Sequence, residues 1–417
     1  MSSLVTSSHT ATPTPNVPLH PAASQGSAPA SASGGATAMA ASAAPTMTGV
    51  APTMKSVLFY QPGDIRYEDI PTPKPGPGEL LIRVRRALTC GTDLKAFRRG
   101  HPVLLKNLPS PFGHECTGEV VALGQGVDRF ELGERVMVAN SAPCGDCFYC
   151  HHDQPNLCDQ LDLLNGAYAE YLKVPARIVE KNTLRLPPDV SDEAAAFCEP
   201  LSVCLRGIEL CQISAGKRVL IIGIGAIGLL MARLAKLNGA QVVVLGRNAL
   251  KRELADTFAQ ADAVVDVSSG IDAEAIKAAY TPEGIGFDVV IEAVGQPHTW
   301  QAALAMVRRG GLVNCFGGCE SGTSIELDTR RLHYDEITLI SPFHHTPRHV
   351  RHALAMIASG QLDPTPLITH RRPLSQVRQA LRDVAEGQAV KVALYPDALF
   401  EATFFDEGPQ QPAAVEG

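Results

Sequence analysis

The stretch Lys217-Arg218-Val219-Leu220-Ile221-Ile222-Gly223-Ile224-Gly225-Ala226-Ile227-Gly228 decides the fold of this 417-residue chain. An apolar run of buried-strand type is followed at once by three spaced glycines and by a helical pattern to about residue 238. The first glycine allows a tight turn, the second lets the backbone approach a pyrophosphate, and the third allows helix and strand to pack closely. We therefore predict a dinucleotide site at Gly223, Gly225 and Gly228.

Further strand patterns follow the glycines and alternate with helical segments. They lie at residues 241–245, 263–267, 288–295 and 311–316. Such alternation is typical of α/β proteins with a doubly wound parallel sheet. We assign residues 202–341 to this cofactor domain, and expect residues 342–396 to return to the preceding domain through a helix near residues 350–358.

The region before the cofactor domain has a different texture. Residues 54–201 show short strand patterns broken by Gly and Pro turns, which predicts a mostly β domain. Residues 1–53 contain no Lys, Arg, Asp or Glu, and we expect a disordered, low-complexity extension that is dispensable. Residues 397–417 are expected to form a loose C-terminal tail. The crevice between the two domains is the expected ligand site.

Charge and hydropathy exclude two classes of partner. The net charge of −7 leaves no basic footprint for nucleic acid. No run approaches the roughly eighteen apolar residues of a membrane span, so no membrane partner is expected.

The chain has eleven cysteines and no secretion signal, which favours metal ligands and free thiols over disulfides. We expect a cytoplasmic protein.

Four cysteines lie close together in one loop. Their separations of 3, 3 and 8 positions let four thiolates converge on one ion, which predicts a structural zinc site at Cys144, Cys147, Cys150 and Cys158. His151 and His152 lie in the same loop and are expected to be solvated. The other cysteines in or beside apolar runs are expected to be core residues: Cys116, Cys198, Cys204, Cys211, Cys315 and Cys319.

A second metal site is indicated upstream of that loop. His114 and Glu115 follow Gly113 in a tight turn, and Cys90 supplies a soft partner after the strand-like residues 80–84. Three protein ligands with an open fourth position make a catalytic zinc. The third ligand is open between Glu115 and the later Glu199. We predict that the two carboxylates share the coordination sphere and exchange with water.

These motifs carry a family resemblance. Gly113, His114, Glu115, Gly118, Gly124 and Val127 stand at the spacing of the zinc-containing alcohol dehydrogenase signature. From about residue 54 to residue 396, the chain resembles a zinc-dependent medium-chain dehydrogenase, nearest to the sorbitol (polyol) and threonine dehydrogenase branch. The resemblance implies a GroES-like catalytic domain, a Rossmann cofactor domain and two zinc ions per chain, one catalytic and one structural.

The resemblance also implies a reaction. A catalytic zinc lowers the pKa of a substrate hydroxyl before hydride passes to a nicotinamide. Thr92 stands where similar enzymes start a proton relay, whereas Lys95 replaces the histidine that often ends it. Glu199 with Pro200 matches polyol-type relatives, and His344 and His345 lie where those relatives contact substrate. The expected substrate is a small alcohol or polyol.

The corner after the second strand of the cofactor domain bears on cofactor choice. NAD-binding units usually place Asp or Glu there to bind the adenosine ribose. This chain has Arg247, with Lys251 and Arg252 one turn later, and no carboxylate to repel a 2′-phosphate. We predict NADP(H) in preference to NAD(H).

The motifs are also compatible with three alternative functions: a threonine-type amino-alcohol dehydrogenase, a catalytically silent relative acting as sensor or structural protein, and a zinc-bearing interaction module.

For assembly, we expect residues 312–316 to form an outer strand of the sheet with an exposed edge. Such edges pair across two-fold axes, which predicts a homodimer or homotetramer.

Overall fold

The computed structural model describes residues 49–405, apart from residues 103 and 106. The extension predicted for residues 1–53 lies outside the described residues as far as residue 48, and the first strand begins at Thr53. Among the described residues, no helix combines the length and the apolar character that a bilayer crossing requires.

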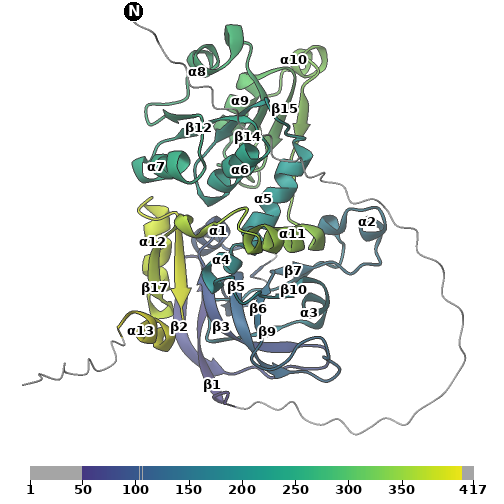
Figure 1. Cartoon of the computed structure of the whole chain (residues 1–417), viewed down its shortest axis with the longest axis vertical. Coiled ribbons are helices and arrows are strands. Elements are labelled where there is room, and N and C mark those ends of the chain that lie inside the picture. The colour runs from purple at the N-terminus through teal and green to yellow at the C-terminus, as the bar shows by residue number, and fades with distance from the viewer. Residues whose placement is uncertain (1–48, 103, 106, 406–417) are drawn as a thin grey trace, which may run out of the picture. The chain divides into compact units, whose positions relative to one another are not determined.

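The cofactor lobe contains a six-stranded, fully parallel sheet in the order β13-β12-β11-β14-β15-β16 (Figure 1). Successive residues of its central strands enter two different hydrophobic clusters: Val219 and Ile221 join one, whereas Leu220 and Ile222 join the other. Both faces of the sheet are therefore covered, and the predicted doubly wound fold is confirmed. The strands are β11 (Arg218–Ile222), β12 (Gln241–Gly246), β13 (Ala263–Asp266), β14 (Phe287–Glu292), β15 (Val307–Cys315) and β16 (Thr338–Ile340). The helices are α6 (Ala226–Leu237), α7 (Ala249–Thr257), α8 (Ala273–Tyr280), α9 (Pro297–Met306) and α10 (Thr329–Tyr334).

The predicted outer strand of this sheet was wrong. Residues 312–315 lie in β15, which pairs with β14 on one side and with β16 on the other. The edge belongs to β16, where Thr338 and Leu339 are exposed. A strand of three residues is too short for its hydrophobic alternation to be read from sequence.

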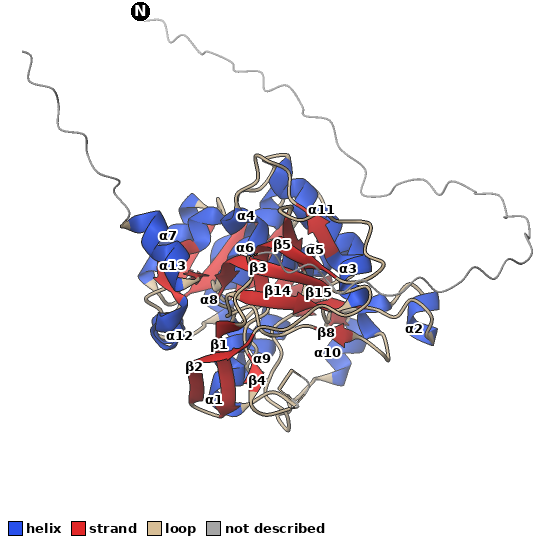
Figure 2. Cartoon of the chain, turned by 90° about the horizontal axis from the view of Figure 1, so that it is seen from below, coloured by secondary structure: helices blue, strands red, loops and turns tan. Residues whose placement is uncertain are grey.

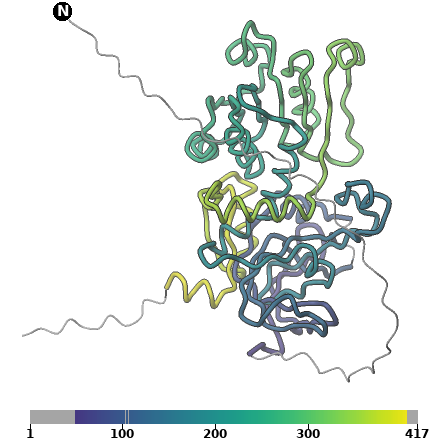
Figure 3. The backbone as a smooth tube through the Cα atoms, turned by 45° about the vertical axis from the view of Figure 1, so that its right-hand side comes forward, coloured from purple at the N-terminus to yellow at the C-terminus, as the bar shows by residue number. Residues whose placement is uncertain are grey.

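The other lobe is mostly β. It is formed by the strands before α5 together with the C-terminal strands β17 and β18. A seven-stranded sheet runs in the order β10-β6-β5-β3-β18-β17, with β9 also paired to β3. The C-terminal part of the chain returns to this lobe, where β18 pairs with β3. Figure 3 shows this part in yellow beside the lobe. A smaller sheet in the order β2-β1-β4 lies near α1 in Figure 2. The strands are β1 (Thr53–Gln61), β2 (Asp64–Pro71), β3 (Leu80–Leu88), β4 (Ser110–Pro111), β5 (Glu115–Leu123), β6 (Arg135–Val138), β9 (Tyr171–Val174), β10 (Thr183–Arg185), β17 (Ile368–Pro373) and β18 (Lys391–Tyr395).

Helices complete this lobe and join it to the cofactor sheet. They include α1 (Gly91–Arg99), α4 (Asp192–Ala196), α5 (Cys198–Leu210), α11 (Pro347–Ala358), α12 (Val377–Ala385) and α13 (Asp397–Phe404). The last of these corrects the expected loose tail over residues 397–404. Phe400 and Phe404 pack edge-on against Tyr395, with ring centroids 5.8 and 5.5 Å away, so aromatic contacts hold this helix against β18. Residues 406–417 lie outside the described residues.

Candidate active site

Strand pairing brings Cys90, His114 and Glu115 together. Leu88 at the end of β3 pairs with Glu115 at the start of β5, and Cys90 follows β3 as the N-cap of α1. The three potential ligand atoms lie within 4.8 Å of one another. Gly113 makes this turn at a φ of 88°, and a Cβ atom there would lie 2.4 Å from the ring of Tyr168. Only glycine fits between that ring and the His114 turn.

The surroundings of His114 fit a metal ligand. Its Nδ1 lies 2.9 Å from Asp93 Oδ1, so Asp93 fixes the ring and leaves Nε2 for another partner. Asp93 is itself held by the backbone N–H of Cys90 at 3.0 Å and by the hydroxyl of Tyr168, which donates at 2.5 Å. Asp93 and Tyr168 were missed from the sequence. Asp93 stands three residues after Cys90 and was detectable there, whereas Tyr168 reaches the site only through folding.

Glu115 is a half-satisfied buried carboxylate. Its Oε2 forms an ion pair with Nζ of Lys391 on β18, while Oε1 has no hydrogen-bond partner. Both side chains are almost fully buried. A free, buried carboxylate oxygen beside a thiol and an imidazole is the donor set that zinc takes. Lys391 was also missed, because 276 residues separate it from Glu115.

Glu199 lies in a second group, with His344 and His345, whose ligand atoms also fall within 4.8 Å of one another. Glu199 occupies the first turn of α5, and the two histidines precede α11. Burial raises the pKa of Glu199 to about 7, an effect that His114 partly offsets, and burial lowers the pKa of His344 to about 4. Both predicted substrate contacts are therefore near one predicted zinc ligand, although Glu199 is grouped apart from the Cys90 trio.

Two residues of the expected proton path lie on α1. Thr92 is half-buried, and its backbone N–H donates to Sγ of Cys90 at 3.4 Å. Lys95 is exposed, and its Nζ donates to the carbonyl of Gly318 at 3.3 Å. Thr92 thus stays next to the candidate metal site, while Lys95 contacts the loop after β15.

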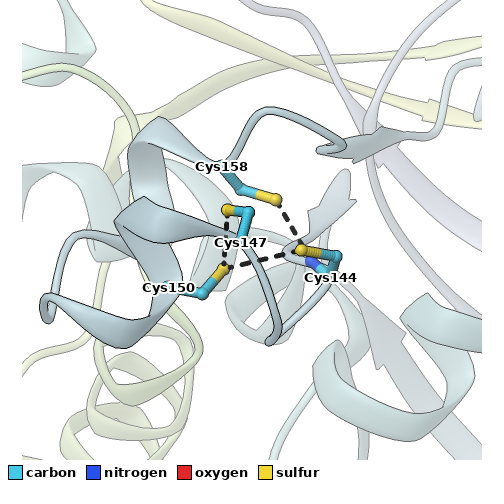
Figure 4. A group of neighbouring side chains, drawn as sticks. All are labelled: Cys144, Cys147, Cys150 and Cys158. Carbon is cyan, nitrogen blue, oxygen red and sulfur yellow. Dashed lines mark hydrogen bonds between the residues drawn. The ribbon is translucent and has the colours of Figure 1, made fainter.

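The four-cysteine loop has the dimensions of a zinc site (Figure 4). Sγ of Cys150 lies 3.9 Å from Sγ of Cys144 and 3.6 Å from Sγ of Cys147, and all four sulfurs, Cys158 included, fall within 4.8 Å. Zinc–sulfur bonds of about 2.3 Å in a tetrahedron require sulfur–sulfur distances of about 3.8 Å. The residues therefore fit a structural zinc. His151 and His152 are exposed, as predicted.

Two of the three glycines after β11, Gly223 and Gly225, border a cavity of about 590 Å³. Gly223 adopts a φ of 100°, which suits the tight turn. A Cβ atom on Gly225 would meet no atom within 4 Å, so this position is open to a ligand. On Gly228 a Cβ atom would lie 1.8 Å from the carbonyl oxygen of Gly223, which shows how closely α6 packs.

The basic corner of this cavity is formed by two of the three predicted residues. Arg247 and Lys251 line the cavity, and the described residues that line it include no Asp or Glu. Arg252 is not among them, which corrects its assignment as a cofactor ligand. Its guanidinium pairs with Asp266 at 2.8 Å and donates to the carbonyl of Arg247, so it stabilises the backbone at Arg247.

A buried carboxylate at the other side of this cavity was not predicted. Glu292 ends β14, is fully buried, and accepts hydrogen bonds from the backbone of Val294 and Gly295 and from the hydroxyl of Thr299. Val294 and Thr299 line the cavity. Glu292 therefore fixes the loop that forms one wall of this cavity.

The remaining cysteines follow the prediction with one exception. Cys116, Cys198, Cys204, Cys211 and Cys315 are buried, whereas Cys319 is half-exposed in the loop after β15 and is not a core residue. Its neighbours in sequence are glycine and glutamate, and a single apolar side chain there does not enter the sheet.

Comparisons with known proteins agree with this geometry. Residues 76–186 match the alcohol dehydrogenase GroES-like domain, and residues 226–359 match the zinc-binding dehydrogenase domain. The chain is 31% identical over 363 residues to sorbitol dehydrogenase of Bacillus subtilis (strain 168), covering 84% of this chain and 100% of the relative. It is 30% identical over 360 residues to D-arabinitol dehydrogenase 1 of Uromyces fabae, covering 84% and 99%. A Sinorhizobium meliloti 1021 structure, described as a zinc-binding dehydrogenase bound to NADP, superposes with a TM-score of 0.76 at 33% identity, covering 82% and 99%.

Proposed function

Because this chain belongs to the zinc-dependent medium-chain dehydrogenase family, we propose that it oxidises a secondary hydroxyl of a polyol with NADP as the preferred acceptor. Its activity class is that of an NAD(P)-dependent oxidoreductase acting on alcohols or polyols. The observation that carries the proposal is the convergence of half-buried Cys90 with buried His114 and Glu115, together with the polar group of Glu199, His344 and His345. Such a polar site suits a substrate with several hydroxyls. The names of two relatives, sorbitol dehydrogenase and D-arabinitol dehydrogenase 1, point to the same class of substrate.

Each part of the site has a role in this reaction. Zinc held by Cys90, His114 and Glu115 would lower the pKa of the substrate hydroxyl. Asp93 keeps His114 in one tautomer and orientation, which preserves the ligand geometry during turnover. Thr92 accepts the hydroxyl proton, and His344 and His345 bind further hydroxyls of the substrate. The four-cysteine loop would hold a second, structural zinc.

A substrate panel tests the proposal. The full-length protein is assayed with sorbitol, arabinitol, other polyols, simple alcohols and L-threonine, using NADP and NAD separately and following reduced nicotinamide by absorbance. We expect turnover with at least one polyol that exceeds turnover with ethanol. Turnover of L-threonine alone would favour the amino-alcohol reading, and no turnover of any compound by zinc-loaded protein would contradict the proposal.

Arg247 should determine the cofactor preference. A charge-assisted bond between a guanidinium and a phosphate contributes about 2 to 3 kcal/mol, which corresponds to roughly 30- to 160-fold in kcat/KM. We expect Arg247→Asp to lower kcat/KM for NADP by about that factor and to leave or improve kcat/KM for NAD. Steady-state kinetics with both cofactors measure this.

Arg252→Ala is the matched control for that variant. Arg252 lies in helix α7, just after Arg247, but it pairs with Asp266 and does not line the cavity, so its loss should change the NADP to NAD ratio far less. A wild type that prefers NAD, together with an unchanged Arg247→Asp variant, would refute the assignment.

Glu115 and Glu199 are proposed to share the catalytic coordination sphere and to exchange with water. Glu115→Gln and Glu199→Gln should each lower kcat by roughly 100-fold or more, because several kcal/mol of charge stabilisation depends on the metal. Metal analysis should show that the zinc of the four-cysteine loop remains in both variants. Full activity of Glu199→Gln with unchanged metal content would make Glu199 a structural carboxylate.

Assembly and location are part of the proposal. The short exposed strand β16 is the edge at which two cofactor sheets would pair across a two-fold axis, giving a homodimer or homotetramer. Light scattering at micromolar concentration should give two or four chain masses, and Leu339→Asp in β16 should lower that mass. The mass of one chain for the wild type would contradict it. A reducing compartment such as the cytoplasm suits the eleven cysteines, none of which forms a disulfide in the described part of the chain.

A further inference from the structure

We propose that Glu199, His344 and His345 bind a second divalent cation beside the Cys90, His114 and Glu115 centre, in addition to the zinc of the four-cysteine loop. The three ligand atoms converge within 4.8 Å from α5 and from the segment before α11. One carboxylate and two imidazoles form a donor set that holds zinc, iron, manganese or cobalt with positions left open. The inference goes beyond the proposed function, which requires two metal ions per chain; with a cation bound, His344 and His345 would contact the substrate hydroxyls through that cation.

A buried nitrogen of this group lacks the partner that a metal would supply. His345 is only 2% exposed, and its Nδ1 has no hydrogen-bond partner among the described residues. Glu199, in the same group, is 6% exposed. Buried polar atoms in native proteins are normally paired, so the unpaired Nδ1 of His345 indicates a missing ligand.

The two imidazoles are already oriented as metal ligands are. Nε2 of His345 lies 3.0 Å from Oδ1 of Asn140, and Nε2 of His344 lies 2.5 Å from Oγ of Ser141. In each ring, one nitrogen is thus held by a neighbouring polar group, which fixes the ring and leaves the other nitrogen for a cation. Asn140 and Ser141 are adjacent, so one short segment orients both rings.

The backbone at His344 supports the same conclusion. Adjacent side chains of an extended segment point in opposite directions, yet these two rings have centroids only 4.1 Å apart. His344 adopts a φ of 65°, in the left-handed region that a residue other than glycine seldom occupies. This conformation places both imidazoles on one side, and conformations of this kind concentrate at binding sites.

Glu199 belongs to the histidine group by position. The charges of His114, Glu115 and Lys391 also act on its pKa. A carboxylate has two oxygens, and one can exchange at the first metal while the other binds the second cation. A two-metal arrangement of this kind is known in other enzymes.

Cobalt counting tests the site without depending on turnover. The full-length protein is stripped of metal with a chelator, reloaded with Co²⁺ alone, and analysed by elemental mass spectrometry and absorption spectroscopy. We expect three Co²⁺ ions per chain. Two of them have thiolate ligands and give sulfur-to-cobalt charge-transfer bands, whereas the third has only nitrogen and oxygen ligands and adds ligand-field bands alone.

His345→Ala and His344→Gln should each reduce the count to two and leave the charge-transfer bands unchanged, which also reports that the protein remains folded. His352→Ala is the matched control, because His352 lies in α11 outside the group and should leave three ions. Saturation of the wild type at two ions, or three ions retained in His345→Ala, would overturn the site. Neither result bears on the dehydrogenase activity, which the substrate panel measures separately.

Discussion

Replacing Cys90 by serine should reduce kcat/KM by roughly 1,000-fold or more, the largest effect on activity expected for a single residue. Cys90 is the only sulfur in the Cys90, His114 and Glu115 group, and its thiolate would be the strongest ligand of the catalytic zinc. Loss of a metal that stabilises the developing charge removes several kcal/mol, and about 4 kcal/mol corresponds to a factor of about 1,000. Steady-state kinetics with the preferred polyol measure the loss.

Metal content and folding distinguish this effect from general damage. Cys90→Ser should lose the catalytic ion but retain the ion of the four-cysteine loop, and its melting temperature should stay near that of the wild type. Cys198→Ser changes a buried cysteine that belongs to neither metal group and should retain both ions. If Cys90→Ser kept full activity, the catalytic centre would have to lie elsewhere.

Replacing Cys147 by serine should cause the largest loss of stability. A structural zinc contributes roughly 10 kcal/mol or more of binding free energy in small zinc domains, and part of this is lost when one of four thiolates is removed. The loop has little core of its own: Phe148 is 65% exposed and Leu157 is 42% exposed. We therefore expect the melting temperature to fall by roughly 10 °C and the segment 144–158 to become sensitive to proteases.

Scanning calorimetry and limited proteolysis measure these changes. Cys319→Ser is the matched control, because Cys319 is half-exposed and belongs to no metal group, so its melting temperature should change little. A metal-free Cys147→Ser protein that melts with the wild type and resists cleavage would show that the loop folds without zinc.

Features that depend on neighbours along the chain could be predicted from sequence. The apolar run before Gly223 and the spacing of the three glycines predicted the parallel sheet and its phosphate turn, since strand burial and turn geometry are local properties. The four-cysteine loop was predictable for the same reason, because its short separations limit the distances between the thiolates. Cys90 and His114 were predicted from motifs that each lie within a few residues.

Contacts between groups far apart in the chain depend on folding and were not predictable from sequence. Lys391 pairs with Glu115, and Glu199 joins His344 and His345, because strands and helices far apart in the chain pack side by side. The same packing turned Arg252 toward Asp266 and put β16 outside β15. Hydrophobic periodicity records which face of an element is buried, but not which element covers it. The partners of a buried charge are therefore fixed by packing and cannot be read from local pattern.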